Sequence, residues 1–403
     1  MQDAQPQIRL GLLIVMCFAL LPIGFNEFSI NYLFVAIPLF RVFTKGSFQL
    51  LPIFFIFALF CYVALFFLSI FLLPDGFYDP VRRIASWLIF ISVFAFSFCK
   101  ISDADIRTFK LALIIVSIIY SATIAIIFVR ANLISAVGYE AKNIVGSQRF
   151  GFVYTLALWV LLFDQHLKSQ LGKAKTIFII ILLIGIALTF SRAAIVALLA
   201  SFFLFGLLNV RSNWRLIIFD GRVKVSPFIK IFMSFLAITT VYIVAPVTFQ
   251  FYWDMFFAPL LDGRLAAATS HPTSSEGIRF ERLQAILDYI TDHPFLGSGF
   301  LGVWSILPST GSAHNQYLDV LLRTGLIGFT IYLTMLFKMV RFLARRDKGL
   351  FYGLISILVY GFFHETFKDS QGAFIMSFIL GIMSQDWRSG QHSIKRRSLQ
   401  KLQ

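Results

Sequence analysis

The chain has 403 residues, of which 58% are hydrophobic and 14% are charged. An ordinary water-soluble domain has roughly 45–50% apolar and about 25% charged residues, so this composition excludes a single water-soluble core. The net charge of +15 could indicate nucleic-acid binding, but the basic residues fall in short clusters between apolar runs. That distribution is typical of membrane topology and argues against a nucleic-acid partner.

Long apolar runs follow one another along most of the chain. A helix needs about 20 apolar residues to cross the hydrocarbon core, and only helices or closed barrels satisfy their backbone there. Unbroken runs exclude the alternating pattern of a barrel. The sequence therefore predicts an all-α, polytopic membrane protein with about twelve transmembrane helices. The runs lie at 11–28, 30–42, 50–73, 84–99, 111–129, 150–165, 176–190, 192–209, 229–249, 325–340, 350–364 and 370–386.

The basic clusters predict the orientation of these helices. With the N-terminus in the cytoplasm, most of the 35 Lys and Arg residues fall on the inside, as the positive-inside rule requires. We expect a bacterial inner (cytoplasmic) membrane protein with both termini cytoplasmic. The first run lacks a small-residue cleavage site, so we read it as a retained helix. Residues 1–249 would then hold nine helices, 325–386 three more, and 387–403 a basic cytoplasmic tail.

The segment 250–324 interrupts the apolar runs and faces the periplasm in this topology. It contains a helical stretch from Arg279 to Thr291, closed by a His-Pro pair. A second short helix is expected near His314, with Ser312 as its N-cap. A loop of this length usually carries function or is disordered, and its helix signals and aromatic residues favour function. We therefore expect this large periplasmic loop to carry catalytic groups.

Four arginines lie near the outer face once the basic clusters are assigned to the inside. Arg149 starts the sixth run and Arg192 separates the seventh from the eighth. Arg279 and Arg282 are three residues apart, hence on one helix face. A charge at the membrane usually marks a functional or paired site, although an arginine can also snorkel to the interface. A guanidinium group donates two parallel hydrogen bonds to phosphate oxygens. On the outer face of a membrane, the phosphate ligand that we predict is a polyprenyl diphosphate carrying a glycan.

His314 is the candidate base, because it lies where the loop meets a helix near the same membrane face. Its imidazole could accept a proton from a sugar hydroxyl; the alternative is a structural histidine. Its neighbours Asn315 and Tyr317 are secondary candidates. His364, beside Glu365 at the outer end of the eleventh run, is a further candidate pair for orienting or binding.

Metal or cofactor use has little support in the sequence, and none is expected. No HExxH, CxxC or cluster of outer carboxylates is present. Asp103-Ala-Asp105 resembles the acidic pair of nucleotide-sugar transferases, but it falls in a cytoplasmic loop too small for a nucleotide domain. Arginines could stabilise a diphosphate leaving group in place of a metal.

Four motifs occur in the chain. They are RFG at 149–151, LTFSRA at 188–193, an Arg279-bearing helix ending in HPFLGSG at 293–299, and HNQYLD at 314–319 followed by LLRTGLIG at 321–328. Together they resemble the signatures of the O-antigen polymerase and O-antigen ligase superfamily. The resemblance implies a metal-independent, GT-C-like membrane glycosyltransferase fold with an undecaprenyl-diphosphate-linked glycan as donor. Carried over by residue, it makes His314 the base and Arg192 and Arg279 diphosphate ligands.

The resemblance leaves the acceptor open. A polymerase extends another lipid-linked repeat unit, whereas a ligase transfers the glycan to the lipopolysaccharide core; likeness of the stretch HNQYLDVLLRTG favours the polymerase. Such an enzyme would work with a flippase and a chain-length regulator. Members often carry an acidic residue where Arg323 stands and an aromatic near Leu283, which bears on acceptor preference. The rival class is a secondary transporter, but the chain lacks related halves, and a scaffold would not require Arg192 and His314.

Overall fold

The structure, a computed structural model, describes segments spread over the whole chain. Helices dominate these segments, and one pair of short strands accompanies them. The described residues are 10–21, 24–25, 28–29, 101–130, 150–164, 167, 169, 171–172, 174–189, 191–220, 275–299, 302–303, 306, 313–366, 369 and 371–383.

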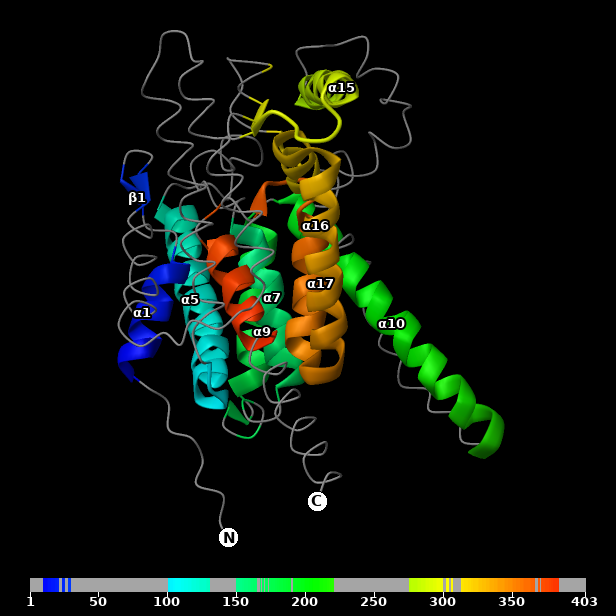
Figure 1. The fold of residues 1–403 in the computed structure, drawn as a ribbon. Coiled ribbons are helices and arrows are strands. Elements are labelled where there is room, and N and C mark those ends of the chain that lie inside the picture. Colours follow the sequence, from blue (N-terminus) through cyan, green and yellow to red (C-terminus); the bar gives the residue numbers. More distant parts are fainter. Residues whose placement is uncertain are drawn as a thin grey trace, which may run out of the picture.

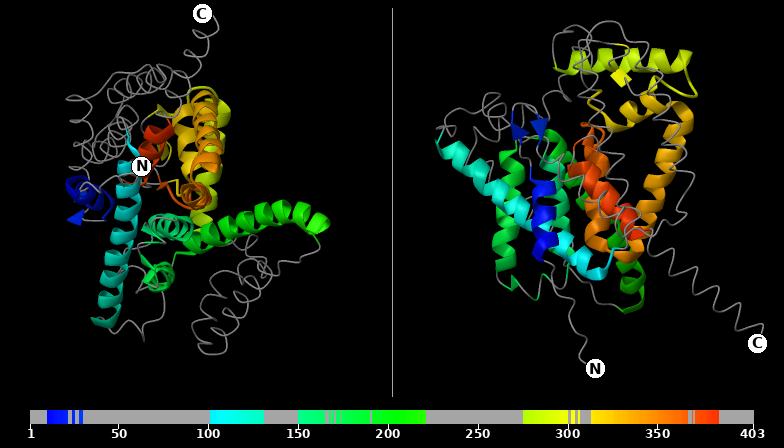
Figure 2. Two further views of the ribbon diagram at one scale, coloured as in Figure 1. Left: turned by 90° about the horizontal axis from the view of Figure 1, so that it is seen from below. Right: turned by 60° about the vertical axis from the view of Figure 1, so that its left-hand side comes forward.

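The described helices form an upright bundle with one helix lying across its upper end. Figures 1 and 2 show α5, α7, α9 and α17 packed side by side, while α15 runs crosswise above α16. The strands β1 (Gly24–Phe25) and β2 (Phe28–Ser29) pair antiparallel, so the described part is helical apart from this small hairpin. The helices are α1 (Leu10–Leu20), α5 (Asp103–Arg130), α7 (Gly151–Phe163), α9 (Ala174–Leu188), α10 (Arg192–Asp220), α15 (Ser275–Asp292), α16 (Gln316–Arg346), α17 (Lys348–Tyr360) and a last helix, Gln371–Met383.

Aromatic side chains and a few shared hydrogen bonds hold the bundle core. Trp159 of α7 is fully buried, and its Nε1 donates to Ser201 Oγ of α10 at 2.9 Å. Ser356 of α17 donates to the same Ser201 oxygen at 2.8 Å. Three helices are thus joined by polar contacts inside an apolar core. Interhelical hydrogen bonds of this kind contribute about 0.6 kcal/mol on average in membrane proteins.

The outside of the bundle is also apolar. α9 exposes Ile177, Ile180 and Ile184, and α10 exposes Leu199 and Phe203. Helices that are hydrophobic all round are found in deep cores or in membranes. Because these side chains face outward, a membrane is the environment that fits them.

Two described helices are long and apolar enough to cross a membrane, Asp103–Ile127 within α5 and Gln316–Arg346. The other apolar helices in the described segments are shorter. Together with the composition and the outward apolar side chains, they make the chain an integral membrane protein. The number of twelve helices and the GT-C-like topology stay predictions, because the runs 30–42, 50–73, 84–99 and 229–249 lie outside the described residues.

Several helices differ in length from the apolar runs that predicted them. α1 ends at Leu20 rather than near 28, and α10 continues to Asp220 instead of ending at 209. α5 starts at Asp103 because Ser102 and Asp105 cap it reciprocally, with Ser102 Oγ donating to Asp105 Oδ2 at 2.8 Å and Asp105 N donating to Ser102 Oγ at 3.2 Å. The acidic pair at 103–105 therefore begins a helix, which apolar patterning does not reveal.

α16 joins two elements that the sequence predicted separately, the short helix near His314 and the tenth apolar run. Asn315 is its N-cap: Oδ1 accepts hydrogen bonds from the N–H groups of Tyr317 at 2.9 Å and Leu318 at 3.1 Å. The prediction of Ser312 as the cap was therefore wrong by three positions. Asn and Ser cap helices about equally well, so propensity alone could not choose between them.

Gly325 breaks α16, with φ 58° and ψ −168°. A side chain rarely tolerates this backbone. The turn at 294–298 supplies hydrogen-bond partners for backbone groups that the break leaves without helical ones. The N–H groups of the two residues after Gly325 donate to the carbonyl oxygens of Pro294 (2.7 Å) and Phe295 (3.4 Å). In return, Ser298 N donates to Leu322 O at 2.7 Å. The HPFLGSG motif thus packs into the break in the LLRTGLIG motif.

A cluster of charged side chains joins the helices at the other end of the bundle. Lys110 of α5 lies 2.7 Å from Asp164, which follows α7, and 2.5 Å from Asp347, the N-cap of α17. Arg346 bonds Asp103 at 3.1 Å nearby. The positive-inside rule assigns this end to the cytoplasm; that orientation stays a prediction.

Replacing Gly325 with Ala should destabilise the protein by about 2 kcal/mol or more, because a Cβ there would lie 2.3 Å from the backbone of Phe295 at a positive φ. Thermal unfolding of the purified protein in detergent measures the loss. Gly206→Ala in α10 is the matched control, since nothing lies within 4 Å of its added Cβ. Equal melting temperatures for the two variants would show that the glycine does not maintain the break.

Candidate functional site

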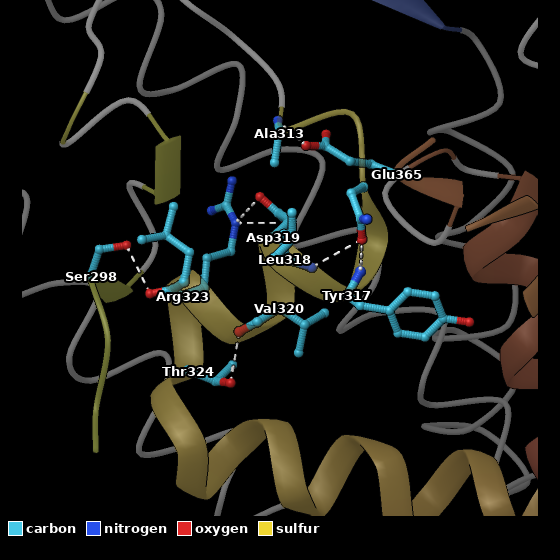
Figure 3. A network of polar contacts seen from close by, with 11 residues as sticks. Ser298, Ala313, Tyr317, Leu318, Asp319, Val320, Arg323, Thr324 and Glu365 are labelled. Atoms are coloured by element: carbon cyan, nitrogen blue, oxygen red, sulfur yellow. Dashed lines mark hydrogen bonds and ion pairs between the residues drawn. The ribbon is translucent and has the colours of Figure 1, made fainter. Parts of the chain in front are cut away.

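The segment before α16 is attached to the turn that follows α17. Ala313 N donates to Glu365 Oε1 at 2.5 Å, as Figure 3 shows, and Gln316 N donates to Gly361 O at 2.7 Å. These two bonds lie on either side of His314 in the chain. The backbone around the candidate base is therefore fixed from both sides.

His314 has a φ of +52° and is the one non-glycine residue of the described segments with a positive φ. Such a backbone costs about 1–3 kcal/mol and persists only when its surroundings enforce it. Here the two flanking hydrogen bonds and the Asn315 cap enforce it. The half-buried imidazole thus begins from a constrained backbone, a feature that clusters at functional sites.

Tyr360, at the end of α17, connects the other motif segments. Its buried hydroxyl lies 3.5 Å from Ser191 Oγ, directly before α10, and its ring stacks on His364 with centroids 4.8 Å apart. A Cβ at Gly151, the first residue of α7, would lie 3.1 Å from the Tyr360 ring and 2.8 Å from Ala194. The starts of α7 and α10 therefore meet the end of α17.

Two of the secondary candidates make structural contacts at the start of α16. Tyr317 Oη donates to Leu358 O at 2.6 Å, and its ring lies 4.5 Å from that of Phe362. Asn315 uses its side-chain oxygen to cap α16. These contacts give both residues a structural role within the site.

A buried ion pair lies on the first part of α16. Arg323 Nε donates to both carboxylate oxygens of Asp319 at 3.0 Å, and the two side chains are 2% and 0% exposed (Figure 3). Gly302 lies against the guanidinium group, since a Cβ there would be 2.6 Å from Arg323 Cζ. The pair thus joins the segment after the HPFLGSG turn to the start of α16.

α15 covers the same end of the bundle. It carries Arg279 and Arg282, and the Arg282 side chain is half-buried. Partial burial raises the pKa of the Tyr289 hydroxyl on this helix. α15 packs on α16 through a small apolar cluster, whose buried members are Ile286, Val303, Ala313 and Leu322.

The structure brings five predicted residues together around the ends of α16 and α17. They are His314, Asn315, Tyr317, His364 and Glu365. In the described segments no cluster of three or more His, Cys, Asp or Glu side chains is arranged to hold a metal ion.

The arginines are placed less completely. Arg192 is the first residue of α10, so its backbone lies beside Ser191 and Tyr360. Arg279 is a residue of α15. The side chains of both, and the whole of Arg149, lie outside the described residues. Their convergence on one diphosphate stays a prediction.

Residues 177–333 match the family model described as O-antigen ligase. The match covers 157 of the 403 residues, so the central part of the chain is similar to that family. The match runs from α9 to α16 and includes three of the four motifs, which confirms the resemblance to the O-antigen ligase and polymerase superfamily. No match was found among curated proteins.

Two features around the candidate site were not predicted from the sequence, the Asp319–Arg323 pair and the position of Tyr360. Asp319 and Arg323 are four residues apart on a predicted helix, which is the spacing of an intrahelical ion pair. Tyr360 and His364 are also four apart. Spacing could have suggested both contacts, but only the fold shows that Tyr360 meets α7 and α10.

Replacing Glu365 with Ala should lower the free energy of unfolding by about 1.5 kcal/mol, because Ala313 N loses a charged acceptor. Glu365→Gln keeps an acceptor oxygen and should lose less. Thermal unfolding in detergent compares the two variants. If both unfold at the same temperature, the Glu365–Ala313 hydrogen bond does not hold the segment before α16.

Proposed function

We propose that this protein transfers a glycan from a polyprenyl diphosphate to a hydroxyl acceptor on the periplasmic face of the bacterial inner membrane. The single observation that supports this most is the meeting of motif segments at one end of the bundle. The starts of α7, α10 and α16, the 294–298 turn and the end of α17 contact one another there. Motif segments that are far apart in the chain and meet at one end of the bundle are what a shared site requires.

His314 is the general base in this proposal. It takes the proton of the acceptor hydroxyl while the acceptor oxygen attacks the anomeric carbon of the donor. The bond from that carbon to the diphosphate oxygen breaks, and the polyprenyl diphosphate leaves with the electron pair. In-line displacement of this kind inverts the configuration at the anomeric carbon. The constrained backbone at residue 314 supports the assignment, because it holds the imidazole in place before the acceptor binds.

Arg192 and Arg279, with Arg149 and Arg282, bind the diphosphate in this proposal. Three helices, α7, α10 and α16, start at this end of the bundle. Helix N-termini carry partial positive charge and favour anions. Guanidinium groups add bidentate hydrogen bonds to phosphate oxygens and stay charged in a low dielectric. Both contributions stabilise the developing charge on the leaving group.

The acceptor decides between two activities. Polymerisation, in which the acceptor is another undecaprenyl-diphosphate-linked repeat unit, is favoured by the likeness of the HNQYLDVLLRTG stretch. Ligation to the lipid A-core is supported by the description of the matching family model. Both use the same donor and the same site, with a flippase supplying the donor and, for the polymerase, a chain-length regulator as partner.

His314→Asn should reduce glycan transfer by about 100-fold or more, because the general base is lost, while the protein stays inserted. Asn tolerates the left-handed backbone better than Ala does, so the variant separates chemistry from folding. The measurement is product formation in vesicles that contain the purified protein and lipid-linked repeat units, with or without lipopolysaccharide core. Transfer at the native rate would exclude His314 as the base. The acceptor that yields product distinguishes polymerase from ligase, and no product with either would favour transport.

Arg192→Lys should raise the KM for the lipid-linked donor and lower kcat, because an ammonium group cannot supply two parallel hydrogen bonds. Arg215→Lys, at the other end of α10, is the matched control and should behave as the native protein. Native kinetics for Arg192→Lys in the same vesicle assay would reduce Arg192 to an interfacial anchor.

A further inference from the structure

Four exposed apolar side chains gather at the break in α16. Phe295 and Leu296 of the turn are 64% and 58% exposed, and Leu326 and Ile327, just after the break, are 46% and 53% exposed. The backbone hydrogen bonds between the two segments hold these side chains side by side. These four side chains form the apolar tip.

The apolar tip continues the outward face of the long part of α16. Leu333 and Phe337 are exposed further along the same helix, and Lys338 follows as an exposed charge. From Leu326 to Phe337 this apolar face is about 17 Å long at 1.5 Å per residue. The hydrocarbon core of a bilayer is about 30 Å thick. The apolar face is therefore shorter than the hydrocarbon core, and snorkelling of Lys338 makes up only part of the missing length. The hydrocarbon is expected to reach past the break, as far as the apolar tip.

The exposed threonines on this face have hydrogen-bond partners within the chain. The hydroxyl groups of Thr330 and Thr334 each donate to the carbonyl oxygen four residues earlier, at 2.7 and 2.8 Å. At the break, the turn carbonyls accept from the first two N–H groups of the new helical segment, and Leu322 O accepts from Ser298. Broken helices are tolerated at membrane depth only when their backbone groups find partners in the protein. These three backbone bonds supply such partners at the break.

We propose that the side chains of the apolar tip insert into the acyl chains of the adjacent leaflet, so that the 294–298 turn caps the broken helix at the membrane interface. The chain changes character just before it, because Asp292 and His293 are exposed and polar. The boundary between headgroups and hydrocarbon therefore lies close to Pro294. The occupant of this face is lipid, since the tip is continuous with the lipid-facing surface of a membrane-spanning helix.

The insertion also determines the position of α15 relative to the membrane surface. This helix ends directly before the tip and lies across the bundle in Figure 2. With the tip in the acyl chains, Arg279 and Arg282 on α15 are held near the level of the headgroups. That consequence rests on the proposed function, in which these arginines bind a lipid-linked diphosphate; the insertion of the tip itself does not.

Spin labels at the tip test the insertion directly. The full-length protein, with Cys17, Cys61 and Cys99 replaced by Ala, receives a single cysteine through Phe295→Cys or, separately, Leu296→Cys. Each variant is labelled with a nitroxide and reconstituted in phosphatidylethanolamine–phosphatidylglycerol vesicles. Oxygen, which partitions into hydrocarbon, should relax both labels more than a water-soluble nickel chelate does.

Two positions serve as controls in the same background. Phe337→Cys, on the exposed face of α16, should behave as the tip labels do, and Asp292→Cys should respond mainly to the nickel chelate. Tip labels that respond mainly to nickel would overturn the proposal. Tip labels shielded from both reagents would overturn it as well, because a protein surface rather than lipid would then cover the tip. Neither result depends on glycan transfer, so the proposed function is tested separately.

Discussion

The need to give every polar group a partner inside the protein governs this structure. In a membrane, water cannot satisfy a free N–H or carbonyl group, and each one left unpaired costs several kcal/mol. The buried Trp159–Ser201 hydrogen bond meets this requirement in the bundle core. The Lys110 cluster meets it where α5, α7 and α17 join. The 294–298 turn meets it at Gly325, where a helix could not otherwise break.

The same requirement explains why the site is made of helix ends and tight turns. Helix ends expose backbone groups that must be bonded, and bonding them to another segment fixes that segment in space. Ala313 and Gln316 bond the turn after α17 in this way, which places His314 between two fixed points. The candidate base thus lies on a rigid part of the molecule. A catalytic group needs such support, because its position relative to the substrates must be held closely.

The sequence predicted the helical, membrane-spanning character and the motif segments, because hydrophobic run length and short signatures are local properties. It predicted the meeting of Glu365 with the segment of His314 only in outline, as two candidates near one membrane face. The merger of two predicted helices into α16 was missed, since the glycine at 325 is a stop signal in the sequence and a break in the structure. The Asn315 cap was missed because Ser312 satisfied the same rule.

The buried Asp319–Arg323 ion pair lies at a position where this chain departs from the motif that it resembles. An acidic residue at position 323 would face Asp319 inside the protein, and two buried carboxylates cannot both ionise without a large free-energy cost. Arg323 avoids that repulsion and reaches Gly302 as well. A buried ion pair adds little net stability compared with apolar residues of similar size, so stability does not explain it. Its effect is geometric: it fixes the segment after the HPFLGSG turn against the first part of α16, beside the constrained backbone of His314.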